Sequence, residues 1–215
     1  MFSFGANGQT TPPLIVYPYK RIPKDIAASV PKDWGLAASD SVWMKREIFF
    51  EYVGNIFCPF VLSLNIQFPV ILFVDGHKTH LDRKLSELCT NLQIILTALY
   101  PNATPILQPA DVSTFKPLKD GWKKGVMVWR RNHPTVELQK VHFAPILKTV
   151  INNTITPDIS TKGFRACGLC PWNPDALDYS KCLGKNKSSL VSDIRLTPSF
   201  PYGGKNCWTE QNRAF

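Results

Sequence analysis

The sequence contains no apolar run long enough to cross a membrane as a helix, which takes about 20 apolar residues in succession. Its longest apolar stretch is interrupted by Glu51, Asn55, Pro59 and Asn65. The start, Met1-Phe2-Ser3-Phe4-Gly5, lacks the basic segment that opens a secretory signal peptide. We therefore expect a protein that stays inside the cell and has no membrane partner.

The six cysteines are scattered, and only Cys167 and Cys170 have the spacing of zinc ligands. A structural zinc site usually needs a second close pair of ligands. The stretch from Cys182 to Cys207 offers neither such a pair nor a histidine. A zinc site is therefore the less favoured interpretation of these cysteines.

Acidic residues are few. The chain of 215 residues has 16 Asp and Glu against 25 Lys and Arg, which gives a net charge of +9. Its 44% hydrophobic and 12% aromatic residues are enough to build a folded core. The excess of positive charge favours a polyanionic partner such as nucleic acid, and the alternative is an ordinary basic soluble protein.

Hydrophobic spacing predicts that strands and helices alternate along the chain. Repeated strand and helix units favour parallel pairing with right-handed crossovers. Residues 19–39, which are rich in proline, are expected to be irregular. The predicted elements are a β-hairpin from residues 2–5 and 13–18, strands over 70–75 and 94–99, and helices over 42–60, 81–92, 114–131 and 136–151, the last with a break at Pro145.

Two acids are the most informative residues of the chain. Asp75 ends an apolar, β-branched run and should lie at the carboxyl tip of a buried strand, where open α/β sheets place their sites. Asp111 stands just before a predicted helix. Two carboxylates that share a crevice repel each other unless a cation neutralises them, so the pair predicts a bound Mg²⁺ or Mn²⁺.

Several collinear motifs resemble the DDE transposase superfamily, in particular its pogo, Tigger and Jerky-like branch. The resemblance covers roughly residues 1–178. Ala110, Ser113, Cys170 and Trp172 depart from the family pattern, and none of these departures removes a charge. The motifs are Gly5-Ala6-Asn7-Gly8, Asp75-Gly76-His77-Lys78-Thr79-His80, Leu107-Gln108-Pro109-Ala110-Asp111-Val112-Ser113-Thr114-Phe115-Lys116-Pro117-Leu118-Lys119, and Gly163-Phe164-Arg165-Ala166-Cys167-Gly168-Leu169-Cys170-Pro171-Trp172-Asn173-Pro174-Asp175.

The resemblance implies an α/β fold with an RNase H-like mixed sheet flanked by helices. It also implies a catalytic site in which three carboxylates hold two Mg²⁺ or Mn²⁺ ions, with Asp75 and Asp111 as two of the catalytic metal ligands. Relatives carry the first aspartate on a strand that precedes the Ala6-Asn7-Gly8 turn, and no residue of this chain fills that position. Asp40 is the tempting substitute, but it fits better as the N-cap of the helix over residues 42–60.

We therefore expect a core that lacks the first catalytic strand, binds metal weakly or as a single ion, and does not cleave DNA by itself. An open sheet edge would favour self-association into a homo-oligomer.

Two further groups of residues are candidates for the site. His77 and His80 are expected to orient the strand tip, and metal ligation by either histidine is the alternative. Along the predicted helix after Asp111, an apolar face with Trp122 and Trp129 alternates with a basic face. We expect this basic face to bind DNA phosphates, and the alternative is that it is merely solvated. It consists of Lys116, Lys119, Lys123 and Arg130.

The predicted organisation is a partial DDE core over residues 1–133, a helical extension over 134–180 and a flexible tail over 181–215. The predicted function is that of a nuclear, DNA-binding remnant or fragment of a DDE transposase catalytic domain, with no small-molecule substrate. The alternative is a domesticated, non-catalytic nuclear protein that binds DNA or a protein partner. A phosphatase or other hydrolase explains fewer of the motifs.

Overall fold

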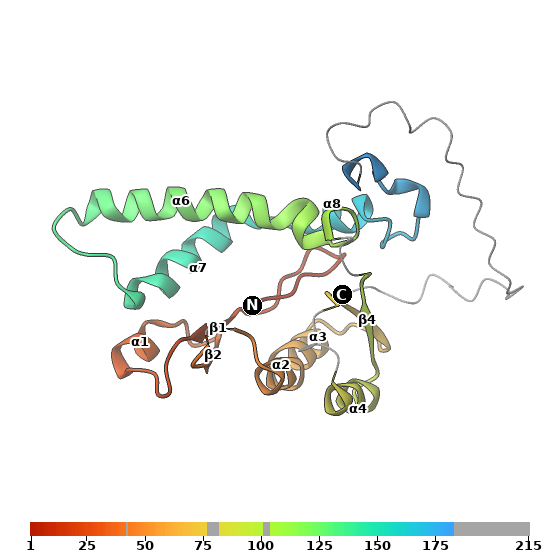
Figure 1. Cartoon of the computed structure of the whole chain (residues 1–215), viewed down its shortest axis with the longest axis horizontal. Coiled ribbons are helices and arrows are strands. Elements are labelled where there is room, and N and C mark those ends of the chain that lie inside the picture. The colour runs from red at the N-terminus through yellow and green to blue at the C-terminus, as the bar shows by residue number, and fades with distance from the viewer. Residues whose placement is uncertain (42, 77–81, 101–103, 183–215) are drawn as a thin grey trace, which may run out of the picture.

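The structure, a computed structural model, describes residues 1–41, 43–76, 82–100 and 104–182. Figure 1 shows short strands alternating with helices along these ranges. The strands are β1 (Leu14–Tyr17), β2 (Gly35–Ala38), β3 (Val70–Val74) and β4 (Ile94–Ala98). The helices are α1 (Lys24–Ser29), α2 (Arg46–Tyr52), α3 (Cys58–Ser63), α4 (Arg83–Asn91), α5 (Thr104–Leu107), α6 (Phe115–Asn132), α7 (Phe143–Thr154) and α8 (Pro157–Ala166). Shorter helical turns are η1 (Val53–Phe57), η3 (Ala110–Thr114), η4 (Lys140–His142), η5 (Pro174–Ala176) and η6 (Tyr179–Cys182).

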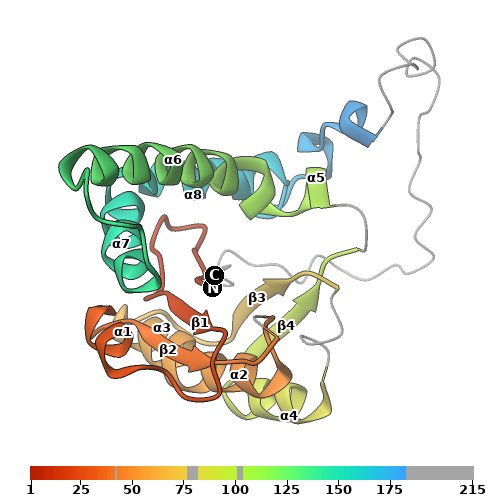
Figure 2. The same ribbon diagram turned by 60° about the vertical axis from the view of Figure 1, so that its left-hand side comes forward.

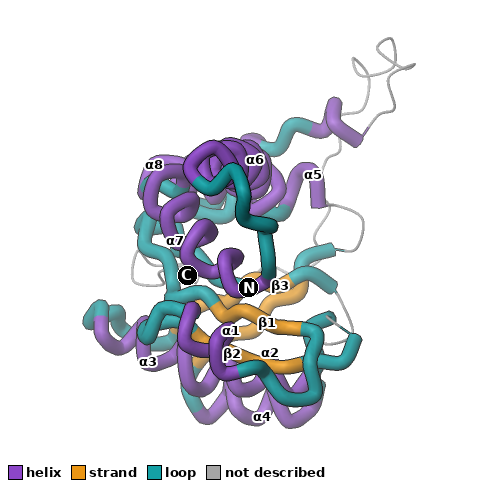
Figure 3. The backbone as a smooth tube through the Cα atoms, turned by 90° about the vertical axis from the view of Figure 1, so that its left-hand side faces the viewer, coloured by secondary structure: helices purple, strands orange, loops and turns teal. Residues whose placement is uncertain are grey.

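The strands form two parallel pairs, β1 with β2 and β3 with β4. In the second pair the register starts with Val70 opposite Ile94, which confirms the parallel pairing predicted for residues 70–75 and 94–99. Helices α2, α3 and α4 lie on one side of the strands and α6, α7 and α8 on the other (Figures 2 and 3). This α/β layering agrees with the predicted class, although the described strands do not join into one mixed sheet.

The main core lies where β3 meets the helices before and after it. One continuous helical segment runs from α2 through the π-helical turn η1 into α3, as the apolar spacing predicts. Tyr52, Phe57 and Val61 on this segment pack with Val70 of β3 and Leu85 of α4, and each is at most 2% exposed. Burial of large apolar side chains on both flanks fixes β3 in the middle of the molecule.

The predicted role of Asp40 as a helix N-cap is wrong. The helix begins at Arg46, and Lys45 occupies the N-cap position. Asp40 instead forms an exposed ion pair with Lys45. The described residues between the two partners, Ser41, Trp43 and Met44, are not helical.

The N-terminal part also differs from the prediction. The expected hairpin is present in part: Phe4 and Thr10 form an antiparallel bridge, and backbone hydrogen bonds join Gly5 to Gln9, Ser3 to Thr11 and Met1 to Leu14, without regular strands on the two sides of the turn. Residues 19–39, expected to be irregular, contain α1 and β2. The prolines of this stretch lie at element boundaries, where they are tolerated: Pro23 is the N-cap of α1, and Pro31 follows its end.

Tertiary contacts stabilise these N-terminal elements. Tyr17 and Ile26 form a second core with Ala144 of α7, which neither strand nor helix propensity reveals. The buried Tyr52 hydroxyl donates a hydrogen bond to Ser3 Oγ at 2.9 Å and lies 2.7 Å from Thr11 Oγ1. The N-terminal segment is thereby tied to α2.

Helices α6 and α7 pack closely because two glycines of α6 face α7. A Cβ atom on Gly121 would lie 2.5 Å from Thr154 Oγ1, and one on Gly125 would lie 2.7 Å from Val150 Cγ2. Glycine therefore has a packing reason at both positions, which outweighs its low helix propensity. The predicted break at Pro145 is wrong, since this proline lies in the first turn of α7, where its missing N–H costs nothing.

We predict that Gly125→Ala lowers the free energy of unfolding by about 1–3 kcal/mol, because the added methyl group must push α6 away from α7. Urea unfolding measures this change. The matched control is Gly54→Ala, whose Cβ would meet only Leu88 Cδ2 at 3.7 Å. That control should be neutral or stabilising by up to about 1 kcal/mol. Equal stability of the two variants would contradict the packing role of Gly125.

Candidate metal and nucleic-acid site

Asp75 directly follows β3, at the carboxyl end of the β3–β4 pair. The pairing extends to this end, since the Leu99 N–H donates to the Val74 carbonyl at 2.8 Å. Side chains alternate along a strand, so Asp75 shares a face with Phe73, whereas Val74 points into the main core. Asp75 is half-buried. The prediction that this strand delivers its carboxylate at its tip is confirmed.

Asp111 lies in the π-helical turn η3, which leads directly into α6. This turn is on the same side of the strands as α6, α7 and α8 (Figure 2). The Asp111 N–H donates to the Gln108 carbonyl at 3.1 Å, which closes the turn. Thr114, at the end of η3, is completely buried and anchors the turn against the rest of the protein. The carboxylate itself is exposed. The sequence predicts a helix start here but gives no sign of its π-helical form.

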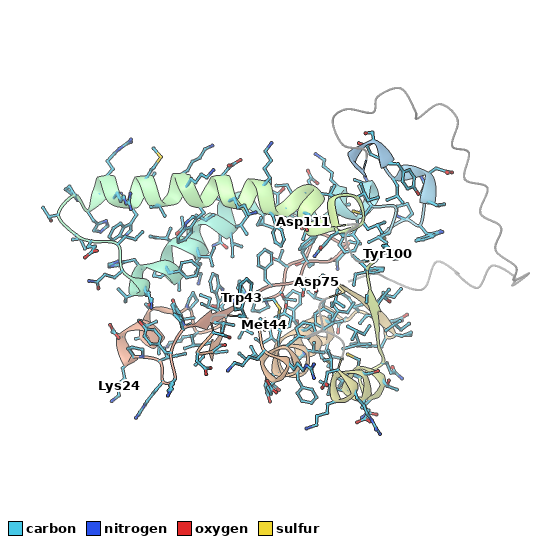
Figure 4. The ribbon with its side chains drawn as sticks, viewed as in Figure 1. Lys24, Trp43, Met44, Asp75, Tyr100 and Asp111 are labelled. Carbon is cyan, nitrogen blue, oxygen red and sulfur yellow. The ribbon has the colours of Figure 1, made fainter. Side chains whose placement is uncertain are left out.

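In Figure 4 Asp111 is labelled at the η3 end of α6, and Asp75 is labelled below it. Their charges act on each other. Burial raises the pKa of Asp111, the nearby Lys119 ammonium opposes this rise, and the negative charge of Asp75 adds to it. Two carboxylates in this relation are stabilised by a cation between them.

The two carboxylates suit a divalent cation. Mg²⁺ is commonly bound through one or two carboxylates while it keeps several water ligands. Over the described ranges, no group of three or more His, Cys, Asp or Glu side chains lies close enough to hold a metal ion. The predicted orienting residues His77 and His80 lie outside the described residues.

The zinc interpretation of the cysteines gains no support in the described part of the chain. Cys167 is buried and Cys170 is half-buried. Cys207 and most of the predicted tail over residues 181–215 lie outside the described residues. Cys167 packs in the interior as a small apolar side chain.

The basic face of α6 begins beside Asp111. All four of its predicted members, Lys116, Lys119, Lys123 and Arg130, are exposed. They follow helical spacing along one side of α6, opposite to the glycines that face α7. Lys119 lies close enough to influence the pKa of Asp111. Lys123 has an acidic neighbour, with its Nζ atom 3.8 Å from Asp120 Oδ1.

Gly163 and Phe164 of α8 contact the segments that carry the two acids, a role that the sequence pattern does not reveal. Phe164 is 4% exposed, and its ring centroid lies 6.4 Å from that of Phe73. Gly163 abuts η3, where a Cβ atom would lie 2.9 Å from the Pro109 carbonyl oxygen and still closer to Ser113 Oγ. Their adjacency in one Gly-Phe motif was visible in the sequence, but their partners were not.

Comparison with known proteins identifies the family. Residues 2–155 match the family described as DDE superfamily endonuclease. The chain belongs to this family. The matched part of this DDE protein includes both Asp75 and Asp111 and all of α6, so the carboxylate pair and the basic face lie within the family domain.

One curated relative is the protein named MFS-type transporter clz9 from Cochliobolus lunatus. It is 30% identical over 185 residues, which make up 86% of this chain and 19% of that protein. The chain thus spans about a fifth of that relative's length. No solved structure matches the chain. None of the helices within the described ranges combines the length and apolar character that a membrane span requires.

We predict that Asp111→Asn stabilises the protein at pH 7. Because the pKa of Asp111 is raised in the folded protein, the native state holds its proton more tightly than the unfolded chain does. The stability linked to this group is therefore present at low pH and lost as the pH rises through the raised pKa. Asparagine carries no charge and removes that loss. The free energy of unfolding should therefore rise by at most about 1 kcal/mol, because solvent screens an exposed carboxyl.

Urea unfolding at a series of pH values tests this prediction. The gain from Asp111→Asn should be present at pH 7, shrink as the pH falls through the raised pKa of Asp111, and vanish at pH values below the ordinary Asp pKa. The control is Asp120→Asn, which removes a favourable neighbour of Lys123 and should give no gain. A gain from Asp111→Asn that does not depend on pH would contradict the assignment.

Proposed function

We propose that this DDE protein is part of the catalytic core of a transposase of the pogo, Tigger and Jerky-like branch, with an RNase H-like arrangement of its strands. It would act in the nucleus, where it binds DNA and a divalent cation at one continuous site. The observation that carries this proposal is that both Asp75 and Lys119, the latter on the basic face of α6, act electrostatically on Asp111. Membership in the DDE endonuclease family supports it.

The carboxylates would hold the cation between the two sides of the site. Asp75 would contribute an oxygen ligand from the tip of β3, and Asp111 would contribute one from η3. When bound, Mg²⁺ or Mn²⁺ supplies Lewis-acid polarisation of a phosphodiester oxygen. Lys119 is placed to attract the phosphate toward this point, because its charge already reaches Asp111.

The basic face of α6 would grip the DNA backbone next to the metal. From Lys116 to Arg130 the face is about 21 Å long at the rise of an α-helix. That length corresponds to about six base pairs of duplex DNA. Lysines exposed along one side of a helix contact phosphates without reading bases, so the binding is expected to be weakly selective for sequence.

Paired-metal cleavage calls for more carboxylate ligands than Asp75 and Asp111, and the described residues hold no group of three or more His, Cys, Asp or Glu side chains that could bind a metal ion. We therefore propose DNA and metal binding for the chain as it stands, with strand cleavage as the activity of a complete DDE site. Self-association is part of the same proposal. The transporter name of the fungal relative is not carried over, because the shared stretch is 19% of that protein.

For the DNA-binding part, we predict that the triple variant Lys116→Gln, Lys119→Gln, Lys123→Gln binds duplex DNA more weakly whatever its sequence. Each lost phosphate contact should reduce the slope of log affinity against log salt by about 0.9, so the slope should fall by about 3. Fluorescence anisotropy over a salt series measures both quantities.

A charge-matched control is available at the far end of the molecule. Lys20, Lys24 and Lys32 are exposed and lie on or beside α1, away from Asp111, as the position of Lys24 in Figure 4 shows. Changing these three to Gln alters the net charge equally and should leave the slope nearly unchanged. Equal losses in the two triple variants would mean that binding depends on net charge and not on the basic face of α6.

The metal-binding part is tested by titration with Mn²⁺. We predict that the unmodified protein binds one ion and that Asp75→Asn and Asp111→Asn each abolish this binding. Supercoiled plasmid should not be nicked, because two carboxylates cannot set the paired-metal geometry of in-line displacement. Nicking that disappears on Asp75→Asn would show instead that a further carboxylate completes the site.

A further inference from the structure

Helix α8 contacts both elements that supply the carboxylates. It packs extensively against η3, which carries Asp111, and its Phe164 reaches β3, which ends at Asp75. Within the described residues, β3 and η3 do not pack extensively against each other. The link from α8 to β3 is the single ring contact between Phe164 and Phe73.

The contact with η3 depends on a glycine. Pro109 and Ser113, which lie two residues before and after Asp111, both press against Gly163. A Cβ atom at this position would lie 2.9 Å from the Pro109 carbonyl oxygen, a distance that real Cβ atoms essentially never show. Any larger residue must move α8 away from the turn that holds Asp111.

The contact with β3 depends on the next residue. Phe164 packs on Phe73, with ring centroids 6.4 Å apart and ring planes at 58°. Phe73 lies two residues before Asp75, so the two side chains emerge on the same face of the strand. Phe164 therefore rests on the face of β3 that presents the carboxylate.

The other side of α8 is held in place by the N-terminal segment. The Phe4 ring meets the Phe164 ring edge-on, with centroids 5.9 Å apart. Gly8, whose φ of +84° suits glycine, lies against Pro157 so closely that a Cβ there would approach to 2.6 Å. The Thr161 hydroxyl donates to the Ala6 carbonyl at 3.4 Å. Contacts on several sides leave α8 little freedom to shift.

We propose that Gly163 and Phe164 are positioning residues that set the separation of Asp75 and Asp111. This inference rests on the proposed function, because it explains how the two ligands are held at the spacing of one metal site. Neither residue touches the metal or the DNA. The two residues are adjacent on α8. Gly163 fixes the distance to η3, and Phe164 fixes the distance to β3.

A double-mutant cycle on the carboxylates tests the proposal without metal or DNA. Asp75→Asn, Asp111→Asn and the double variant are compared by urea unfolding at neutral pH in the presence of a chelator. Neutralising either acid removes the same repulsion, so the double variant should gain less stability than the sum of the single variants. The cycle is repeated with Gly163→Ala and, in case that variant folds poorly, with Phe164→Leu.

The matched control is Gly125→Ala, which forces a similar clash between α6 and α7, away from β3. We expect the non-additivity to persist with Gly125→Ala and to disappear with Gly163→Ala or Phe164→Leu. In the same variants, Mn²⁺ affinity should fall about 10–100-fold for the two α8 changes and stay the same for the control.

The proposal would be overturned if the stability gains of Asp75→Asn and Asp111→Asn stayed non-additive in both α8 variants. It would also be overturned if these gains were additive in the otherwise unmodified protein. Loss of Mn²⁺ binding in every variant, including the unmodified protein, is a separate result. If the cycle still responds to Gly163→Ala in that case, the positioning role stands and the metal-binding function fails.

Discussion

The proposed metal site needs two carboxylates of like charge to be held near each other, and they come from β3 and η3, which make few direct contacts. This constraint connects the site to the rest of the structure. Burial against the main core fixes β3, and buried Thr114 fixes η3. Helix α8 joins the two with a glycine on one side and a phenylalanine on the other. Burial, and to a smaller extent the negative charge of Asp75, raises the pKa of Asp111, and the packing energy of these elements offsets the cost of the charged carboxylate.

The parts that the sequence predicts best are those in which local pattern and tertiary burial agree. β3 is a short β-branched run buried on the core side, and α6 has apolar and basic residues at helical spacing, so both appear near their predicted positions. The two acids follow from these elements, because the end of a strand and the start of a helix can be placed from sequence.

The parts that could not be predicted depend on partners distant in the chain. α1 and β2 are stabilised by burial against α7, whose contribution no local pattern reports. Gly121 and Gly125 look like weak helix formers until α7 is seen to lie against them. Asp40 looks like a helix cap until Lys45 is seen to pair with it. Likewise, the Gly163-Phe164 pair is a recognisable motif whose two partners only the fold reveals.

The most direct test of the shared site is a crystal structure of the protein with Mn²⁺, using the anomalous scattering of the metal to locate it. We predict one peak between β3 and η3, with an oxygen of Asp75 and an oxygen of Asp111 each about 2.0–2.2 Å from the ion. A peak at other residues, with the two carboxylates too far apart to share one ion, would contradict the central claim that β3 and η3 build a single metal site.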